Sequence, residues 1–123
     1  MSRFTSLYVG AALLAAAVCP PALADGASAG SAVFMQCMAC HTADASNATG
    51  PGLGGLLGRV SGTHAGFRYS RAMKNAKLTW DAKNLDAFIA NPQQVVPGNV
   101  MPFSGIASAA DRTALIAYLA TLK

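Results

Sequence analysis

Five consecutive residues, Cys37-Met38-Ala39-Cys40-His41, constrain this chain more than any other feature of its sequence. A Cys-x-x-Cys pair followed directly by His is the pattern of covalent haem attachment. Each thiol can add to one vinyl group of the porphyrin, and the His is then held beside the iron. The pentamer therefore predicts one haem c with its iron, attached through Cys37 and Cys40 and bound by His41.

Three other interpretations of the pentamer fit less well. A zinc site needs about four ligands, which the two His and the few Cys of this chain could barely supply. A thioredoxin-like pair would follow a strand, whereas this pair ends a stretch rich in Ala, Val and Phe. A disulfide between Cys37 and Cys40 would leave His41 unexplained.

The N-terminus has the pattern of an export signal. Arg3 precedes an apolar run over residues 7–18, two prolines follow, and residues 22–24 form a small-x-small cleavage pattern. A retained anchor is the alternative, but the run is shorter than the roughly 20 residues of a membrane span. We expect a cleaved signal over residues 1–24, a monohaem domain over residues 25–123 and a periplasmic location.

The predicted domain is small and has no Cys outside the pentamer, so no structural disulfide can form in it. Domains of this length bury a limited apolar area. We therefore expect the haem to supply much of the core and the haem-free chain to be poorly folded. The net charge of +4 comes without a basic run, so the sequence does not predict nucleic-acid binding.

Helical spacing of apolar residues predicts an all-α fold with long loops. We expect helices over residues 30–40, 70–76, 81–90 and 108–122. Asn91-Pro92 should end the third helix, and Ser108 should cap the last. The loop over residues 42–66 contains seven Gly but also Leu53, Leu56 and Leu57, which suggests an ordered loop packed on a flat group. Residues 93–106 are expected to form a second loop.

The sixth ligand of the iron has five candidates in the predicted domain. Met101 lies between two prolines in the segment 97–103, which stiffens a loop that would present its sulfur. Met73 is expected to fill core space and His64 to lie on the solvated surface. Met35 and Met38 are too close to the pentamer to reach the opposite face of the haem.

The sequence is similar to the class I c-type cytochromes, in the branch that resembles mitochondrial cytochrome c. The resemblance covers essentially the whole predicted domain. The matching segments are Cys37-Met-Ala-Cys-His41, Gly50-Pro51-Gly52-Leu53, Gly55-Leu-Leu-Gly58-Arg59, Gly66-Phe-Arg-Tyr69-Ser70, Trp80, Asn91-Pro92, Pro97-Gly98-Asn-Val-Met101-Pro-Phe103 and Leu115-Ile-Ala-Tyr118-Leu119.

The resemblance implies a cytochrome c fold, with three main helices, short helical segments and long loops wrapped around one haem. It implies that His41 and Met101 bind the iron and that the Pro51 carbonyl accepts a hydrogen bond from His41. It further implies that propionate contacts come from Arg59, Tyr69 and Trp80. The N- and C-terminal helices should cross near Gly30.

Three departures from the family pattern bear on function. Phe88 replaces a frequent Tyr whose hydroxyl reaches the Met sulfur, and Asn99 replaces a frequent Thr beside a propionate. The residues expected around the haem edge are uncharged, where mitochondrial relatives carry lysines. These residues are Gln36, Gln93, Gln94, Val100, Ala107 and Ala109, and Met38 and Phe103 belong to the same predicted face. We expect a nearly neutral docking face for redox partners, while Lys74, Lys77, Lys83 and Lys123 lie elsewhere.

The leading functional hypothesis is a periplasmic one-electron carrier that works as a monomer. It would approach membranes only through its partner complexes. The alternatives are a haem subunit of a periplasmic oxidoreductase, a peroxidase-like enzyme with a displaceable sixth ligand, and a sensor of small gases. The alternatives with an open or displaceable site should bind carbon monoxide when reduced. The carrier should not bind it, because both of its axial positions are filled.

Overall fold

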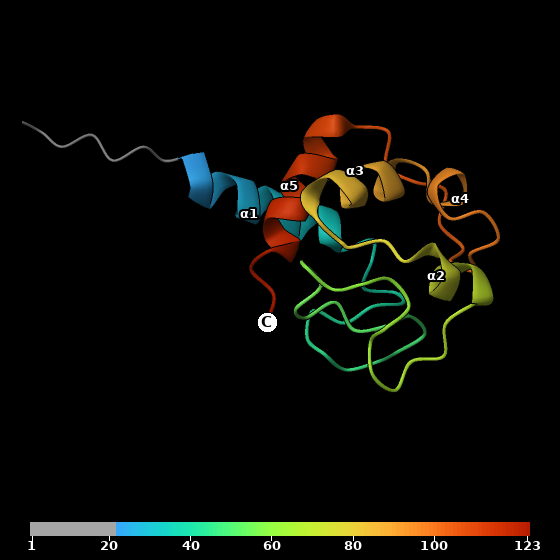
Figure 1. Ribbon diagram of the computed structural model, residues 1–123. Helices are drawn as coiled ribbons and strands as arrows, with labels where there is room; N and C mark the ends of the chain where they lie inside the picture. The colour runs from blue at the N-terminus through green and yellow to red at the C-terminus, as the bar shows by residue number, and fades with distance from the viewer. Residues whose placement is uncertain (1–21) are drawn as a thin grey trace, which may run out of the picture.

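A computed structural model describes the backbone of residues 22–123 and the side chains of residues 26–123. The described chain contains five helices in the order α1 (Ala22–Phe34), α2 (Arg71–Ala76), α3 (Ala82–Ala90), α4 (Pro92–Val95) and α5 (Ala109–Leu119). Long loops connect them and form one side of the molecule (Figure 1). An isolated bridge between Val60 and Thr79 is the sole β-pairing in this range. The all-α prediction is confirmed.

Helices α1 and α5 cross at close range, as the sequence predicted (Figure 1). Gly30 is buried at the crossing, and a Cβ atom added there would lie 2.7 Å from Cβ of Tyr118 and closer still to the backbone carbonyl of Ala114. The rings of Phe34 and Tyr118 pack beside it with centroids 5.1 Å apart. The absence of a side chain at Gly30 therefore lets the first and last helices meet.

The first helix differs from the prediction at both ends. It begins at Ala22, and it ends at Phe34 instead of residue 40. Beyond Phe34 the backbone continues in turns, in which the amide of Cys37 donates to the Phe34 carbonyl and the amide of Cys40 to that of Cys37. Because this three-residue spacing is tighter than that of an α-helix, the pentamer leaves the helix axis. The predicted signal over residues 1–24 lies mostly outside the described residues, and the predicted cleavage site falls within α1.

Helices α2 and α3 agree with the prediction. Ser70 caps α2, and Asp81 caps α3 by accepting a hydrogen bond from the amide of Asn84 at 2.7 Å. The apolar residues Leu85, Phe88 and Ile89 of α3 are all buried. Local capping and apolar spacing were sufficient to locate both helices.

Helix α4 was not predicted, because its residues had been assigned to a loop. Pro92 occupies the first turn, and the Asn91 side chain accepts a hydrogen bond from the amide of Gln94 at 3.2 Å. The same Asn-Pro pair therefore ends α3 and begins α4, since Pro tolerates the first turn of a helix but not its interior. Helix α4 places Gln93 and Val96 beside the loop that carries Met101.

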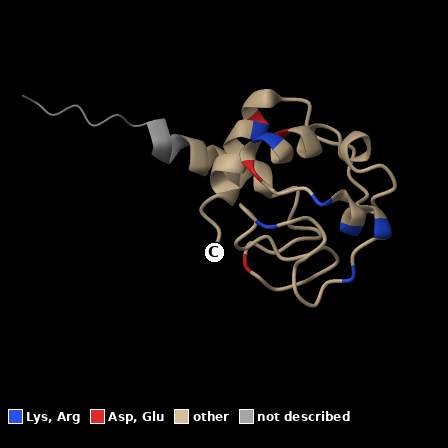
Figure 2. Cartoon of the chain, viewed as in Figure 1, with Lys and Arg blue, Asp and Glu red and all other residues tan. Residues whose placement is uncertain are grey.

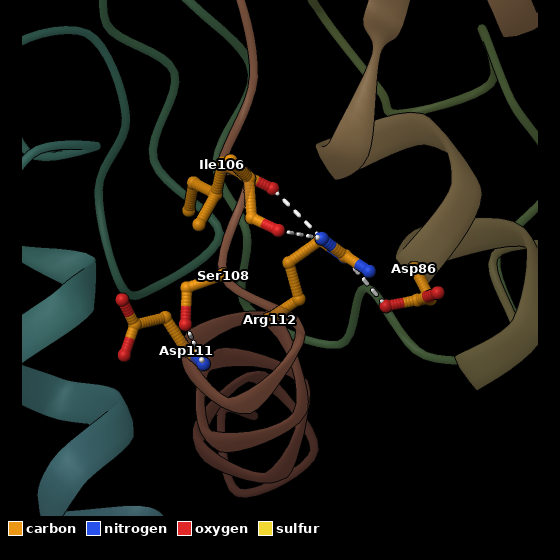
Figure 3. A network of polar contacts seen from close by, with 6 residues as sticks. Asp86, Ile106, Ser108, Asp111 and Arg112 are labelled. Atoms are coloured by element: carbon orange, nitrogen blue, oxygen red, sulfur yellow. Dashed lines mark hydrogen bonds and ion pairs between the residues drawn. The ribbon is translucent and has the colours of Figure 1, made fainter.

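Arg112 links α5 to α3 and to the segment that precedes α5 (Figure 3). Its Nε donates to Oδ1 of Asp86 at 2.7 Å, and its NH1 donates to the carbonyls of Ile106 and Ala107 at 2.9 Å each. Ser108 caps α5 by accepting from the amide of Asp111 at 3.2 Å. Helix α5 ends at Leu119, three residues earlier than expected, and continues as turns.

The Gly-rich loop over residues 42–66 is held by side-chain hydrogen bonds. Asn47 donates to the carbonyl of Ala65 at 3.0 Å and accepts from the amide of Gly52 at 3.2 Å. Leu56 is buried, and Leu53 and Leu57 pack against the same core. The expectation of an ordered, packed loop is therefore confirmed. None of the described helices is both long enough and apolar enough to cross a membrane.

Candidate functional site

A cavity of about 380 Å³ lies between the loops, α2, α3 and α5. Core side chains form much of its wall, including Leu56, Leu85, Ile89, Leu115 and Leu119. All eight residues that the sequence singled out line this one cavity: Cys37, Cys40, His41, Pro51, Arg59, Tyr69, Trp80 and Met101. Residues from separate parts of the chain thus converge on a single, largely apolar space.

Both thiols lie at the edge of this cavity. Cys37 and Cys40 are free and half-buried. Burial raises the pKa of the Cys37 thiol above its ordinary value. The amide of His41 donates to the carbonyl of Cys37 at 2.9 Å, which closes the turn that carries all three side chains.

The ring of His41 is fixed on two sides. Its Nδ1 lies 2.7 Å from the carbonyl oxygen of Pro51, so Nδ1 carries the proton and donates it to that carbonyl. This arrangement leaves Nε2 free to bind a metal and makes it more basic. Gly50 lies directly against the ring, because a Cβ added there would be 2.5 Å from Cε1 of His41. Sequence reasoning used Gly50 as a motif residue and missed this packing role.

Met101 is held through its backbone and by its neighbour Asn99. The amide of Met101 donates to Oδ1 of Asn99 at 3.0 Å, and the carbonyl of Met101 accepts from the amide of Phe103 at 2.9 Å. The Asn99 amide group donates to the carbonyls of Pro92 and Val96. The sequence left a propionate contact at Asn99 open, but its side chain is occupied within this loop.

Three polar side chains reach the cavity from the Gly-rich loop and the segment after α2. Arg59 donates to the carbonyls of Gly52 and Gly54, which anchors its guanidinium at the wall. The hydroxyl of Tyr69 and the indole N–H of Trp80 make no hydrogen bond within the described residues, and no side-chain N or O atom there is both buried and unpaired, so both donors are accessible. These are the donors that a partly buried carboxylate needs.

Apolar side chains form most of the remaining wall. Phe88 packs on Trp80 with ring centroids 5.0 Å apart, and Met73 also faces the cavity. Among the described residues nothing donates a hydrogen bond to the sulfur of Met101. His64 does not line the cavity, and its Nε2 lies 2.9 Å from the carbonyl oxygen of Ala45. No acid–base side chain for peroxidase chemistry therefore comes from His64.

The donor set fits a haem and not a metal ion held by protein ligands alone. Across residues 26–123 no group of three His, Cys, Asp or Glu side chains is close enough to hold a metal ion. The cavity instead offers two thiols in one turn, one imidazole nitrogen, one thioether and the side-chain donors of Arg59, Tyr69 and Trp80. An apolar wall between these groups suits a flat porphyrin with two carboxylates.

The expected docking residues are mostly exposed and uncharged. Val100 is 78% exposed and Met38 is 56% exposed, and Gln36, Gln93 and Gln94 are exposed as well. Phe103 is half-buried. Figure 2 shows basic residues gathered around α2 instead, where Arg68, Arg71, Lys74 and Lys77 are all exposed.

Comparison with known proteins agrees with this geometry. The family model for cytochrome c matches residues 27–123. The cytochrome c-type cyt cy of Rhodobacter capsulatus is 45% identical over 104 residues, which are 84% of this chain and 52% of that relative. This chain therefore spans about half the length of that relative. Cytochrome c2 of Blastochloris viridis is 44% identical over 115 residues, which are 92% of this chain and 90% of the relative.

The fold is also matched by a solved structure. Cytochrome cH from Methylobacterium extorquens aligns with a TM-score of 0.75 and 40% sequence identity, over 77% of this chain and 97% of that one. Family model, relatives and structure agree with the cavity and its pentamer. The chain belongs to the cytochrome c family, and it is an electron-transfer protein, not an enzyme, that binds one covalent haem c.

Proposed function

We propose that this chain is a periplasmic one-electron carrier whose haem is bonded to Cys37 and Cys40 and whose iron is bound by His41 and Met101. The observation that carries the proposal is that one cavity is lined by two side chains suited to the axial positions, and that hydrogen bonds hold both of them. His41 presents Nε2 because Nδ1 is engaged by Pro51 at 2.7 Å, and Met101 is held by backbone hydrogen bonds on both sides. When bound, the haem supplies an iron that accepts and releases one electron.

The cavity wall should favour the reduced state. A thioether is a softer ligand than a second imidazole, and a His/Met pair is associated with a raised reduction potential. The apolar side chains of Leu85, Phe88 and Leu115 keep water and its high dielectric away from the site. The oxidised state carries more positive charge, so such surroundings destabilise it relative to the reduced state.

The polar side chains that line the cavity should bind the propionates. Tyr69 and Trp80 have donors without a partner in the described chain, and Arg59 has further guanidinium protons beyond those given to Gly52 and Gly54. A carboxylate that accepts from these groups would be held in its ionised form. The carboxylates would then fix the orientation of the flat group within the cavity.

Carbon monoxide binding tests the proposed ligation. The reduced holoprotein should bind carbon monoxide slowly or not at all, because Met101 occupies the sixth position. Met101→Ala should bind it rapidly and lose the ferric absorption band that reports sulfur–iron coordination. Met73→Ala is the matched control, since it removes a second thioether from the same cavity and should leave both signals unchanged. Rapid binding by the wild-type protein would contradict the proposal.

Phe88 gives the Met101–iron bond less support than a tyrosine would. With no hydroxyl near the sulfur, the bond should be more labile than in Phe88→Tyr. In an alkaline titration of the ferric protein, the sulfur–iron band should persist to higher pH in this variant. An unchanged midpoint would show that position 88 does not act on the sulfur.

We also propose that redox partners dock on the uncharged face defined by Gln36, Met38, Gln93, Gln94, Val100 and Phe103. Long-range steering needs opposed charges, so the electron-transfer rate with the native partner should depend weakly on ionic strength. A steep fall in rate between low and moderate salt would contradict this face and would indicate docking against the cations around α2.

The chain should run as a monomer in size-exclusion chromatography, and N-terminal sequencing of the exported protein should begin at Asp25.

A further inference from the structure

Two side chains, Asn99 and Gln93, tie the loop that carries Met101 to helix α4. We call this pair the Asn99–Gln93 clasp. The loop runs from Val96 to Met101 and contains Gly98, whose φ of +82° lies in the left-handed region. The chain must reverse sharply here to bring Met101 to the cavity, because α4 ends only six residues earlier.

Asn99 forms the inner half of the clasp. Its side chain is buried, at 6% exposure, and all of its hydrogen bonds stay within this segment. Nδ2 donates to the carbonyl oxygens of Pro92 at 3.0 Å and Val96 at 2.9 Å, while Oδ1 accepts from the amide of Met101 at 3.0 Å. One side chain therefore connects both ends of α4 to the backbone of Met101.

Gln93 forms the outer half. It is exposed, yet both ends of its amide group are bound to the loop. Nε2 donates to the carbonyl of Asn99 at 2.9 Å, and Oε1 accepts from the amide of Gly98 at 3.1 Å. The neighbouring Gln94 is equally exposed, and its side chain has no hydrogen-bond partner among the described residues. The side chain of Gln93 is thus bound to the loop, whereas that of the adjacent Gln94 is not.

The sulfur of Met101 has no direct support from the wall of the cavity. Phe88 has no hydroxyl to offer, and none of the other described residues that line the cavity donates a hydrogen bond to this sulfur. The position of the thioether must therefore be set by the backbone that carries it. That backbone is held by the clasp.

We propose that Asn99 and Gln93 are positioning residues that hold the Met101 thioether at the sixth iron position and thereby determine how often this position opens. The inference rests on the proposed His41/Met101 ligation. Opening requires Met101 to move away from the cavity, which breaks its hydrogen bond to Asn99. Without the clasp, the loop exchanges more readily between closed and open arrangements.

The two halves should differ in effect. Asn99→Ala leaves the half-buried amide of Met101 without its acceptor, and such a loss changes an equilibrium by about tenfold. The carbonyls of Pro92 and Val96 keep a backbone donor each, from the amides of Val96 and Asn99. Gln93→Ala loses one exposed and one half-buried hydrogen bond of an exposed side chain, for which we expect a smaller change of about threefold.

The first experiment compares Gln93→Ala with Gln94→Ala in the holoprotein. The rate of carbon monoxide binding to the reduced form should rise about threefold in Gln93→Ala and stay at the wild-type value in Gln94→Ala. The alkaline midpoint of the ferric sulfur–iron band should fall only in Gln93→Ala. Equal behaviour of the two variants would overturn the role of Gln93. Because both residues lie on the proposed docking face, a docking role alone would not separate them.

The second experiment compares Asn99→Ala with Asn99→Ser. A serine hydroxyl can accept from an amide two residues further on, so Asn99→Ser should recover part of the tenfold increase in binding rate. Thermal unfolding is measured in parallel, because a purely structural role would lower the midpoint without changing the sulfur–iron band. An unchanged band and binding rate in Asn99→Ala would refute the proposal. If the wild-type protein itself lacks the band, the proposed ligation fails instead.

Discussion

The cavity at the centre of this domain predicts a large dependence of folding on the haem. The double substitution Cys37→Ala/Cys40→Ala prevents covalent attachment while changing two small, half-buried side chains. Many residues of the core line the cavity, including Leu56, Leu85 and Leu115, so the same side chains that stabilise the fold would face an unfilled space.

The size of this effect follows from the cavity volume. A core cavity destabilises a protein by about 24 cal/mol per Å³ if its walls do not collapse. For 380 Å³ the product is about 9 kcal/mol, which is an upper value because collapse would recover part of it. The whole free energy of unfolding of a typical domain is about 5–15 kcal/mol. The haem-free chain should therefore have little or no cooperative stability at 25 °C.

Circular dichroism and urea denaturation measure this dependence. The holoprotein should unfold in one cooperative transition, and Cys37→Ala/Cys40→Ala should lose its near-ultraviolet signal and most of that transition. The wild-type chain produced without haem attachment is the matched control and should behave like the variant, since both thiols are then intact. A cooperative transition of the haem-free chain with nearly the holoprotein midpoint would refute the reasoning. A large difference between the two haem-free chains would assign the effect to the cysteines.

Two further predictions concern the packing of the helices. Gly30→Ala should lower the free energy of unfolding by about 1–3 kcal/mol in urea, because its methyl group would overlap the carbonyl of Ala114. Gly26→Ala on the same helix is the control, because a Cβ added there has its nearest contact at 4.0 Å. It should be neutral or stabilising by up to about 1 kcal/mol. Equal effects of Gly26→Ala and Gly30→Ala on the free energy of unfolding would contradict the close crossing of α1 and α5. Arg112→Gln should lower the free energy of unfolding by about 1–3 kcal/mol, because the carbonyls of Ile106 and Ala107 lose this donor. Asp86→Asn should lower the free energy of unfolding by less than about 1 kcal/mol, since Asp86 is 48% exposed. An effect as large as that of Arg112→Gln would show that the ion pair contributes more than the bonds to the two carbonyls.

The haem chemistry of this protein could be predicted from short segments of the sequence. The Cys-x-x-Cys-His pattern is local, because five consecutive residues supply two thiols and an imidazole whatever the chain does elsewhere. The same holds for the capping residues Ser70 and Asp81, which act on amides three positions ahead. Family resemblance added Pro51 and Met101, and the structure brings both to the cavity.

The sequence interpretation was wrong where the outcome depended on how the backbone turns. The first helix ends at Phe34, before the pentamer, and α4 forms where a loop was expected. Gln93 was predicted only as a docking residue, and its side-chain hydrogen bonds to the loop were missed. Such errors arise because turn geometry follows from hydrogen bonds whose partners are not evident from residue type.

The sequence by itself predicted which groups would meet the haem: two thiols, one imidazole and one thioether. Only the tertiary structure decided how these groups are held. The contact of Gly50 with the His41 ring and the three hydrogen bonds of Asn99 join residues whose relation depends on the path of the chain. The physical reason is that covalent chemistry is set by the side chain itself, whereas positioning is set by which backbone groups the fold brings within hydrogen-bonding distance.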